Sequence, residues 1–77
     1  MERESIKNKI CEMAFGGLGV TLSDGEEMRE SGLDSLSLVM LIASMEEAFG
    51  ISFSEDDLDP EQLITLDDLI TLTERYL

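Results

Sequence analysis

An aspartate and a serine stand side by side where a glycine-containing, acidic segment gives way to an apolar one. Asp34 precedes Ser35, and the residues from Ser35 to Phe49 have the apolar spacing of an amphipathic helix. Asp34 is therefore predicted to cap this helix, its carboxylate accepting from a first-turn N–H group. Ser35 then lies in the first turn, where the positive end of the helix tolerates a phosphodiester on the hydroxyl oxygen. A simple cap with no further role explains the same two residues.

Three longer helices and one short one are expected to position this serine in an all-α, up-and-down four-helix bundle. The first helix is predicted from Glu2 to about Phe15, with Gly16 and Gly17 supplying its left-handed end. A long first loop follows from Gly16 to Leu33. Its length suggests that it runs back along the bundle, and three apolar side chains are expected to pin it by burial: Leu18, Val20 and Leu22.

The second half of the chain contains the other three predicted helices. The second helix runs from Ser35 to Phe49 and stops at Gly50. Asp59 is predicted to cap a short helix with Pro60 at its first position. Thr65 and Asp68 form a capping sequence that opens the last helix, from about Leu66 to Tyr76. The expected core stripes are Leu38, Leu41, Ile42, Met45 and Phe49 in the second helix, and Leu66, Leu69, Ile70, Leu72, Thr73 and Leu77 in the last.

The second helix carries more apolar residues than its core stripe needs. Leu36, Met40 and Ala43, continued by Glu47, follow another face, and Val39 flanks it. An ordinary surface helix has polar residues on such a face. Either a small bundle buries this helix more completely than usual, or the face is a docking patch beside Ser35.

Composition excludes several classes of function. The chain has 77 residues, enough for one domain (1–77), and a formal net charge of −13 from eighteen acids and five bases. Nucleic acid is not expected as a partner because its phosphates need Lys and Arg. Proteins with basic surfaces are expected as partners because the chain is strongly negative. With no histidine, Cys–His catalysis is excluded and most zinc sites are too. The acids around Asp24 lack the ligand spacing of a calcium loop, so no metal site is expected.

The chain also carries no obvious sign of export or membrane insertion. Cys11 is the only cysteine, which excludes an internal disulfide and suits a reducing compartment. We read it as an ordinary helix residue. No segment reaches the roughly 18 apolar residues of a membrane span, and the first residues do not read as a signal peptide. The sequence therefore predicts a cytoplasmic protein, and we expect a monomer.

The segment Gly32-Leu33-Asp34-Ser35-Leu36, followed by an apolar helix that ends Met45-Glu46-Glu47-Ala48-Phe49-Gly50-Ile51, resembles the modification site of acyl carrier proteins. The likeness extends over the whole chain in length, acidity, long first loop and order of elements. In that family the serine carries a covalent 4′-phosphopantetheine arm, which a phosphopantetheinyl transferase attaches from coenzyme A. The resemblance therefore implies that Ser35 is the attachment residue and that Asp34 is the cap beside it.

A carrier of this kind is not an enzyme, and the resemblance implies that the arm holds acyl or aminoacyl groups as thioesters for partner enzymes. These partners would load or process the cargo in lipid, polyketide or related biosynthesis, and they would recognise the second helix through basic docking surfaces. The residues implied are Leu36, Val39, Met40, Ala43, Glu46 and Glu47. This helix has Ser37, Met40 and Ser44 where carriers of fatty-acid synthesis commonly have acids, which favours a specialised pathway.

Two other functions are considered from the residues. A small hydrolase with Ser35 as nucleophile lacks a histidine base, and Lys7 or Lys9 would have to replace it. A cofactor-free, acidic helical adaptor that binds partners through the second helix has the same charge, patch and fold as a carrier. Modification of Ser35 distinguishes the adaptor from the carrier.

Overall fold

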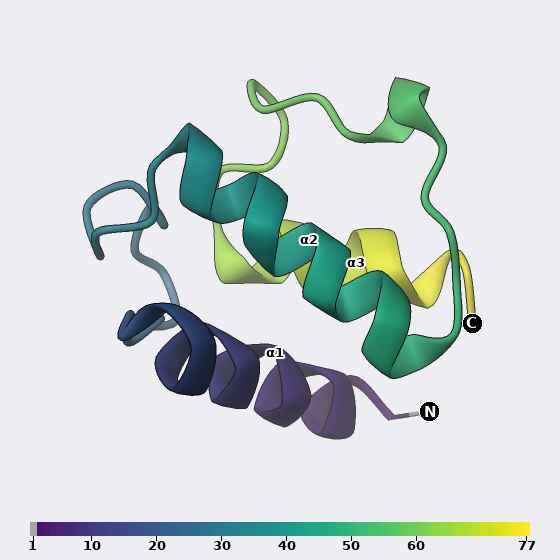
Figure 1. Ribbon diagram of the computed structural model, residues 1–77, viewed down its shortest axis with the longest axis horizontal. Coiled ribbons are helices and arrows are strands. Elements are labelled where there is room, and N and C mark those ends of the chain that lie inside the picture. Colours follow the sequence, from purple (N-terminus) through teal and green to yellow (C-terminus); the bar gives the residue numbers. More distant parts are fainter. Residues whose placement is uncertain (1) are drawn as a thin grey trace.

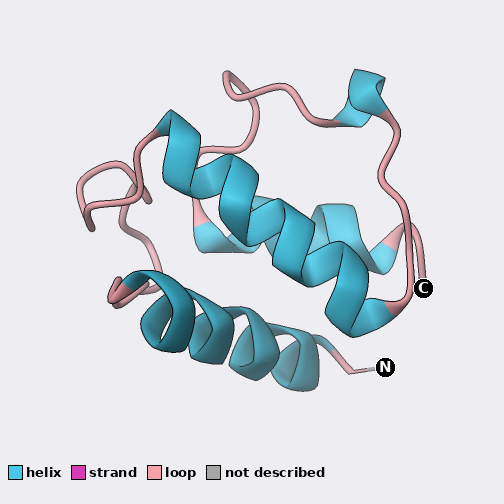
Figure 2. Cartoon of the chain, in the orientation of Figure 1, coloured by secondary structure: helices cyan, strands magenta, loops and turns pink. Residues whose placement is uncertain are grey.

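The computed structural model describes residues 2–77 as a helical protein with three α-helices and one 3₁₀ turn. In chain order these are α1 (Arg3–Leu18), α2 (Ser35–Phe49), η1 (Glu55–Asp57) and α3 (Leu66–Glu74) (Figure 1). No strand forms within residues 2–77 (Figure 2). One isolated antiparallel bridge joins Glu27 to Thr65. The all-α prediction is therefore confirmed. Three longer helices form as predicted, and the short helical element between α2 and α3 is a single 3₁₀ turn.

The first helix is longer than predicted because Gly16 and Gly17 remain helical. The left-handed residue that ends α1 is Gly19, with φ of 68°, whose N–H donates to the carbonyl of Phe15 at 3.0 Å. Extending α1 past the two glycines brings Leu18 to the core, where it is half-buried. The apolar contact of Leu18 outweighs the low helix propensity of two exposed glycines.

The core lies between the facing sides of the three α-helices. α2 buries the predicted stripe, except that Phe49 at its end is half-buried. The buried side chains on the other two helices are Ile6, Ile10 and Ala14 from α1 and Leu66, Leu69, Ile70, Leu72 and Thr73 from α3. The Thr73 hydroxyl donates to the Leu69 carbonyl at 2.8 Å, so this buried polar group is satisfied. Leu77, predicted in the core, is 51% exposed because the chain leaves α3 before reaching it.

The connection from α2 to α3 contains two turns, of which only the one after Asp59 was predicted. Asp59 does act as a cap, since its Oδ1 accepts from the Glu61 N–H at 2.9 Å. Only one hydrogen-bonded turn follows, over residues 60–62, and Leu63 then enters the core. The 3₁₀ turn forms earlier, at η1, where Asp57 accepts from the Tyr76 hydroxyl and from Arg75 Nη2 at 3.0 Å. Side chains distant in sequence therefore hold this turn in place.

The first loop, residues 19–34, is held by buried apolar side chains. Val20 and Leu22 are buried as predicted, and Met28 and Leu33 are buried after them. Lys7 on α1 also pairs with Asp24 at 2.6 Å. Contrary to prediction, the loop does not run back along the helices. It stays at the end of the molecule where α1 finishes and α2 begins (Figure 1), and its length goes into successive turns. None of the helices within residues 2–77 is both long and apolar enough to cross a membrane.

Candidate functional site

The start of α2 is built as the sequence predicts. Asp34 has extended backbone angles, and its Oδ1 accepts from the Ser37 N–H at 2.8 Å. This hydrogen bond is the main reason why the pKa of Asp34 lies below its usual value. The carboxylate is therefore ionised near neutral pH and committed to the cap. Ser35, the next residue, is exposed in the first turn, which contains no acidic residue.

A series of tight turns lies immediately before this cap and explains why a glycine precedes it. Residues 27–32 form consecutive turns that finish at Gly32, with φ of 102°. The Leu33 N–H donates to the Met28 carbonyl at 3.0 Å, and the Gly32 N–H donates to the Arg29 carbonyl at 3.2 Å. This pair of bonds is the Schellman pattern, and the two apolar residues that flank it, Met28 and Leu33, are both buried. Gly32 thus reverses the chain directly into the cap of α2.

A cavity of about 330 Å³ opens beside Ser35. One wall is the first loop, a second is the start of α2, and a third is the segment that leads to α3. The first and third walls are joined, because the Met28 N–H donates to the Ile64 carbonyl at 2.8 Å and Glu27 bridges to Thr65. The lining residues are Glu27, Met28, Arg29, Leu33, Asp34, Ser35, Leu38, Pro60, Glu61, Leu63 and Ile64. A covalent group on Ser35 therefore has room on the protein surface next to its attachment point.

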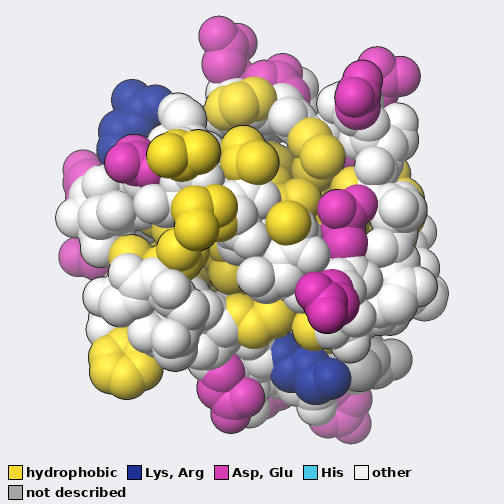
Figure 3. Space-filling view, viewed as in Figure 1, with side chains coloured by type: hydrophobic (Ala, Val, Ile, Leu, Met, Phe, Trp, Pro, Cys, Tyr) yellow, Lys and Arg dark blue, Asp and Glu magenta, His cyan; other side chains and the backbone are white. Residues whose placement is uncertain are grey.

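The second apolar face of α2 is exposed along its length. Leu36 is 71% exposed, Val39 62% and Met40 51%, and Ala43 and Glu47 follow them on the surface. The space-filling view shows hydrophobic side chains gathered over α2, with acidic side chains around them (Figure 3). The alternative that the bundle buries this face is therefore wrong. Large apolar side chains are brought together on the helix that begins with Ser35.

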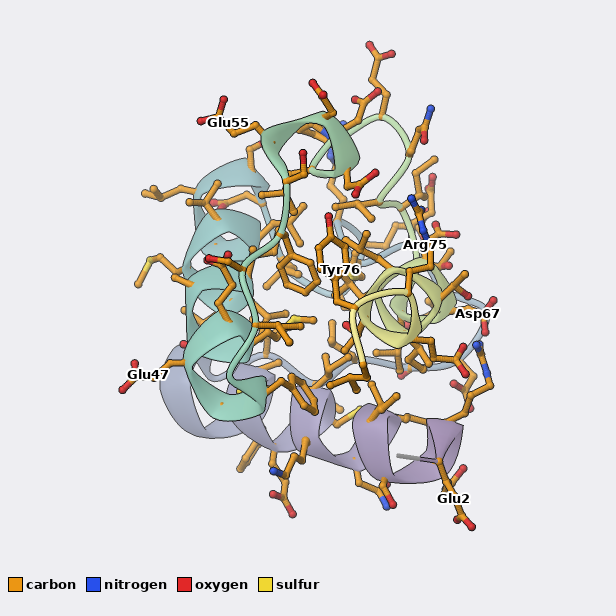
Figure 4. All side chains as sticks on the ribbon, turned by 90° about the vertical axis from the view of Figure 1, so that its right-hand side faces the viewer. Glu2, Glu47, Glu55, Asp67, Arg75 and Tyr76 are labelled. Atoms are coloured by element: carbon orange, nitrogen blue, oxygen red, sulfur yellow. The ribbon has the colours of Figure 1, made fainter. Side chains whose placement is uncertain are left out.

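The two glutamates at the end of α2 have different surroundings. Glu47 projects away from the helix into solvent (Figure 4). Glu46 is half-buried, and its Oε2 accepts from the Phe53 N–H at 2.8 Å, which holds the next connection against α2. One carboxylate oxygen of Glu46 is thus committed to the fold, whereas Glu47 is free for a partner.

Sequence reasoning missed Arg29 and most of the cavity. Arg29 lines the same cavity as Ser35. The walls come together through contacts between residues 27–28 and 64–65, which local patterns do not predict. One signal was present in the sequence, because Arg29 is the single basic residue between Lys9 and Arg75.

The part of the chain that the structure describes contains no competing metal or thiol site. Over residues 2–77 no three Cys, Asp or Glu side chains converge in a geometry suited to a metal ion. Cys11 is half-buried on α1, and burial raises the pKa of its thiol, which disfavours the reactive thiolate.

An exposed serine in a capped first turn and a small helical fold are the features that the resemblance to carrier proteins predicts. Comparison with known proteins agrees. The family model of the phosphopantetheine attachment site matches residues 8–73. An acyl carrier protein of Desulforapulum autotrophicum is 56% identical over 72 residues, covering 91% of each chain. One of Thermotoga maritima is 34% identical over 79 residues, covering 97% of this chain and 95% of the relative.

The same likeness is found in three dimensions. A crystal structure of an acyl carrier protein from Thermotoga maritima superposes with a TM-score of 0.83 at 26% identity, covering 97% of this chain and 89% of the other. The chain belongs to the acyl carrier protein family. Its cofactor is covalent 4′-phosphopantetheine, its role is that of a carrier and not a catalyst, and it works with biosynthetic enzymes. The carrier prediction is confirmed over the cofactor-free adaptor and the hydrolase.

Proposed function

We propose that Ser35 is the residue that carries the arm. The observation that supports this most directly is the exposure of Ser35 in the first turn of α2, beside a cavity and after a cap that fixes its backbone. An anion on its oxygen faces the N-terminal end of a fifteen-residue helix without an acid in its first turn. The bound arm supplies the thiol that holds the cargo as a thioester.

The chain's own part in the attachment is to present a hydroxyl. Ser35 Oγ forms a bond to the phosphorus next to pantetheine, the P–O bond to the second phosphate of coenzyme A breaks, and adenosine bisphosphate leaves. The proton of the hydroxyl needs a base, and the neighbouring Asp34 carboxylate is already engaged by the Ser37 N–H. We therefore assign the base to the transferase.

The test is an intact-mass spectrum after incubation with coenzyme A, Mg²⁺ and a broad-specificity phosphopantetheinyl transferase. The wild type should gain one phosphopantetheine group, and Ser35→Ala should gain none. Ser44→Ala removes another exposed serine from the same helix and should be modified like the wild type. Modification of Ser35→Ala, or none of folded wild type, would contradict the assignment.

We also propose that partner enzymes dock on the exposed face of α2 formed by Leu36, Val39, Met40, Ala43 and Glu47. Its apolar side chains lie on the helix that begins at Ser35, so a partner bound there faces the arm. The net charge of −13 favours partners with basic surfaces around an apolar centre. Glu46, which the resemblance also implicated, we assign to holding Phe53 in place.

The transferase itself serves as the first partner in a test of this face. Met40→Gln keeps the length of the side chain and the helix propensity but removes apolar contact, and should raise the KM for the unmodified protein about tenfold with kcat little changed. Phe15→Gln is the matched control, since Phe15 is 66% exposed but lies on α1. An equal rise in KM for both variants would show that α2 is not the docking element.

The cellular setting and cargo stay predictions. A cytoplasmic location suits the single free cysteine, and a monomer suits a carrier that is passed between enzymes. The apolar docking face favours a specialised pathway over general fatty-acid synthesis.

A further inference from the structure

The five basic side chains of this acidic protein are not used alike. Four of them hold parts of the fold together: Arg3 pairs with Asp67 and Glu74, Lys7 with Asp24, Arg75 with Asp57, and Lys9 lies over the ring of Phe49. For the fifth, Arg29, no ion pair or hydrogen bond of the guanidinium forms within residues 2–77. In a chain with eighteen acids, a cation without an acidic partner calls for an explanation.

The backbone around Arg29 is fixed even though its side chain is exposed. Met28 before it is buried, and the Met28 N–H donates to the Ile64 carbonyl. The Arg29 carbonyl accepts from Gly32 in the Schellman pattern that ends the turn. The guanidinium therefore extends from an anchored segment, which lowers the entropic cost of holding it in one place.

Arg29 is also the only basic residue among those that line the cavity beside Ser35. Apolar side chains and three acids also line this cavity: Met28, Leu33, Leu38, Leu63 and Ile64, and Glu27, Asp34 and Glu61. A guanidinium matches the two free oxygens of a phosphodiester bidentately and keeps its charge at every physiological pH. The protein's negative charge otherwise opposes a further anion at this place.

We propose that the Arg29 guanidinium binds the phosphodiester that joins the arm to Ser35 and so directs the arm across the cavity. Arg29 is a positioning residue, because it acts on the link to the protein and not on the thiol or its cargo. The inference rests on the proposed attachment at Ser35. The contact lowers the number of directions in which the arm leaves α2, both in the free carrier and as a partner approaches.

The experiment compares unmodified and modified forms of three proteins: wild type, Arg29→Gln and Lys9→Gln. Lys9→Gln is the matched control, since it removes the same charge from a residue that does not line the cavity. Intact mass first verifies that each protein carries one arm. Thermal unfolding then gives the change in Tm on modification, a difference that cancels the effect of each substitution on the unmodified fold.

The change in Tm on modification should be lower for Arg29→Gln than for the wild type by about 1–8 °C, the range for one exposed ion pair in a domain of this size. Lys9→Gln should match the wild type. Phosphorus NMR gives a second readout: the phosphodiester signal should shift and sharpen in Arg29→Gln. In the wild type it should move the same way as salt rises to about 0.5 M, because salt screens the pair.

Equal changes in Tm for Arg29→Gln and Lys9→Gln, with a phosphorus signal indifferent to Arg29 and to salt, would overturn the inference while leaving the attachment at Ser35 intact. Failure of the wild type to accept the arm would instead overturn the proposed function and this inference with it. The two failures are thus distinguished by the mass spectrum alone.

Discussion

The two connections on either side of α2, residues 19–34 and 50–65, have the same length but are held in different ways. The first is fixed mainly by apolar burial, with Met28 and Leu33 each 3% exposed. The second buries Phe53 and Leu63 but adds a polar network centred on Tyr76. The Tyr76 hydroxyl accepts from the Ser54 N–H at 2.9 Å and donates to Asp57.

This difference fits what each connection does. The first connection leads directly into Ser35, and although its Asp24 pairs with Lys7, its Arg29 lines the cavity. The second connection supplies the opposite wall and uses its polar groups to attach itself to the end of α3. The stabilisation from apolar burial does not depend on pH, whereas that from hydrogen bonds between a carboxylate and a phenol does. The two connections should therefore respond differently to substitution and to pH.

The largest effect is expected from Leu33→Ala, which removes an apolar anchor directly before the cap. A truncated, fully packed leucine costs about 2–4 kcal/mol of unfolding free energy through lost burial and the cavity left behind. Leu36→Ala makes the same chemical change three residues later at a side chain that is 71% exposed, and should cost less than about 0.5 kcal/mol. Urea unfolding measures both. Similar losses for the two variants would mean that burial does not hold the first connection.

The features that the sequence predicted well are those set by neighbours in the chain. The cap at Asp34, the end of α2 at Gly50 and the capping box of Thr65 and Asp68 each depend on residues within one or two turns. The same holds for Ser35, whose place in the first turn follows from the cap. The apolar periodicity of α2 gave both its buried stripe and its exposed face.

The errors arose where distant residues decide. A 3₁₀ turn forms at η1, before the single turn that follows Asp59, where Asp57 accepts from Tyr76, a residue beyond the end of α3. α1 passes through Gly16 because Leu18 contacts a core built by the other helices. The cavity wall at Arg29 depends on the bonding of residues 27–28 to 64–65. None of these contacts has a signature in local sequence.

A smaller effect separates two kinds of glycine in and before the first connection. Gly32 has φ of 102°, so Gly32→Ala should lose about 1–2 kcal/mol through backbone strain, although its Cβ meets no atom within 4 Å. Gly17 is helical and also open to a Cβ, so Gly17→Ala should gain about 0.5–1 kcal/mol. Chemical unfolding of both variants tests the sign. Destabilisation by Gly17→Ala would restore the prediction that α1 ends at the double glycine.

The smallest effect concerns the hydrogen-bond network of Tyr76 in the second connection, and a titration measures it. Tyr76 is the only tyrosine and the chain has no tryptophan, so ultraviolet absorbance follows its ionisation directly. Its hydroxyl donates to Asp57, which raises the pKa of Tyr76 above its ordinary value of 10.0. The same hydrogen bond is the main cause that lowers the pKa of Asp57 below 3.8. The stability that Tyr76 contributes is therefore present below pH 10 and is lost as the pH rises through the pKa of Tyr76 in the folded protein. The stability that Asp57 contributes is present above pH 3.8 and is lost as the pH falls through the pKa of Asp57 in the folded protein.

Asp57→Asn should accordingly lower the pKa of Tyr76 toward its ordinary value and weaken the attachment of the second connection. Asp56→Asn removes an equal charge one residue away at an exposed position and should leave the pKa of Tyr76 higher than Asp57→Asn does. Comparing the two variants separates the effect of the specific hydrogen bond from that of the protein's negative charge as a whole, which also raises the pKa of a phenol. If both substitutions lower the pKa equally, the field alone holds the proton on Tyr76, and the second connection is fastened by its buried side chains as the first one is.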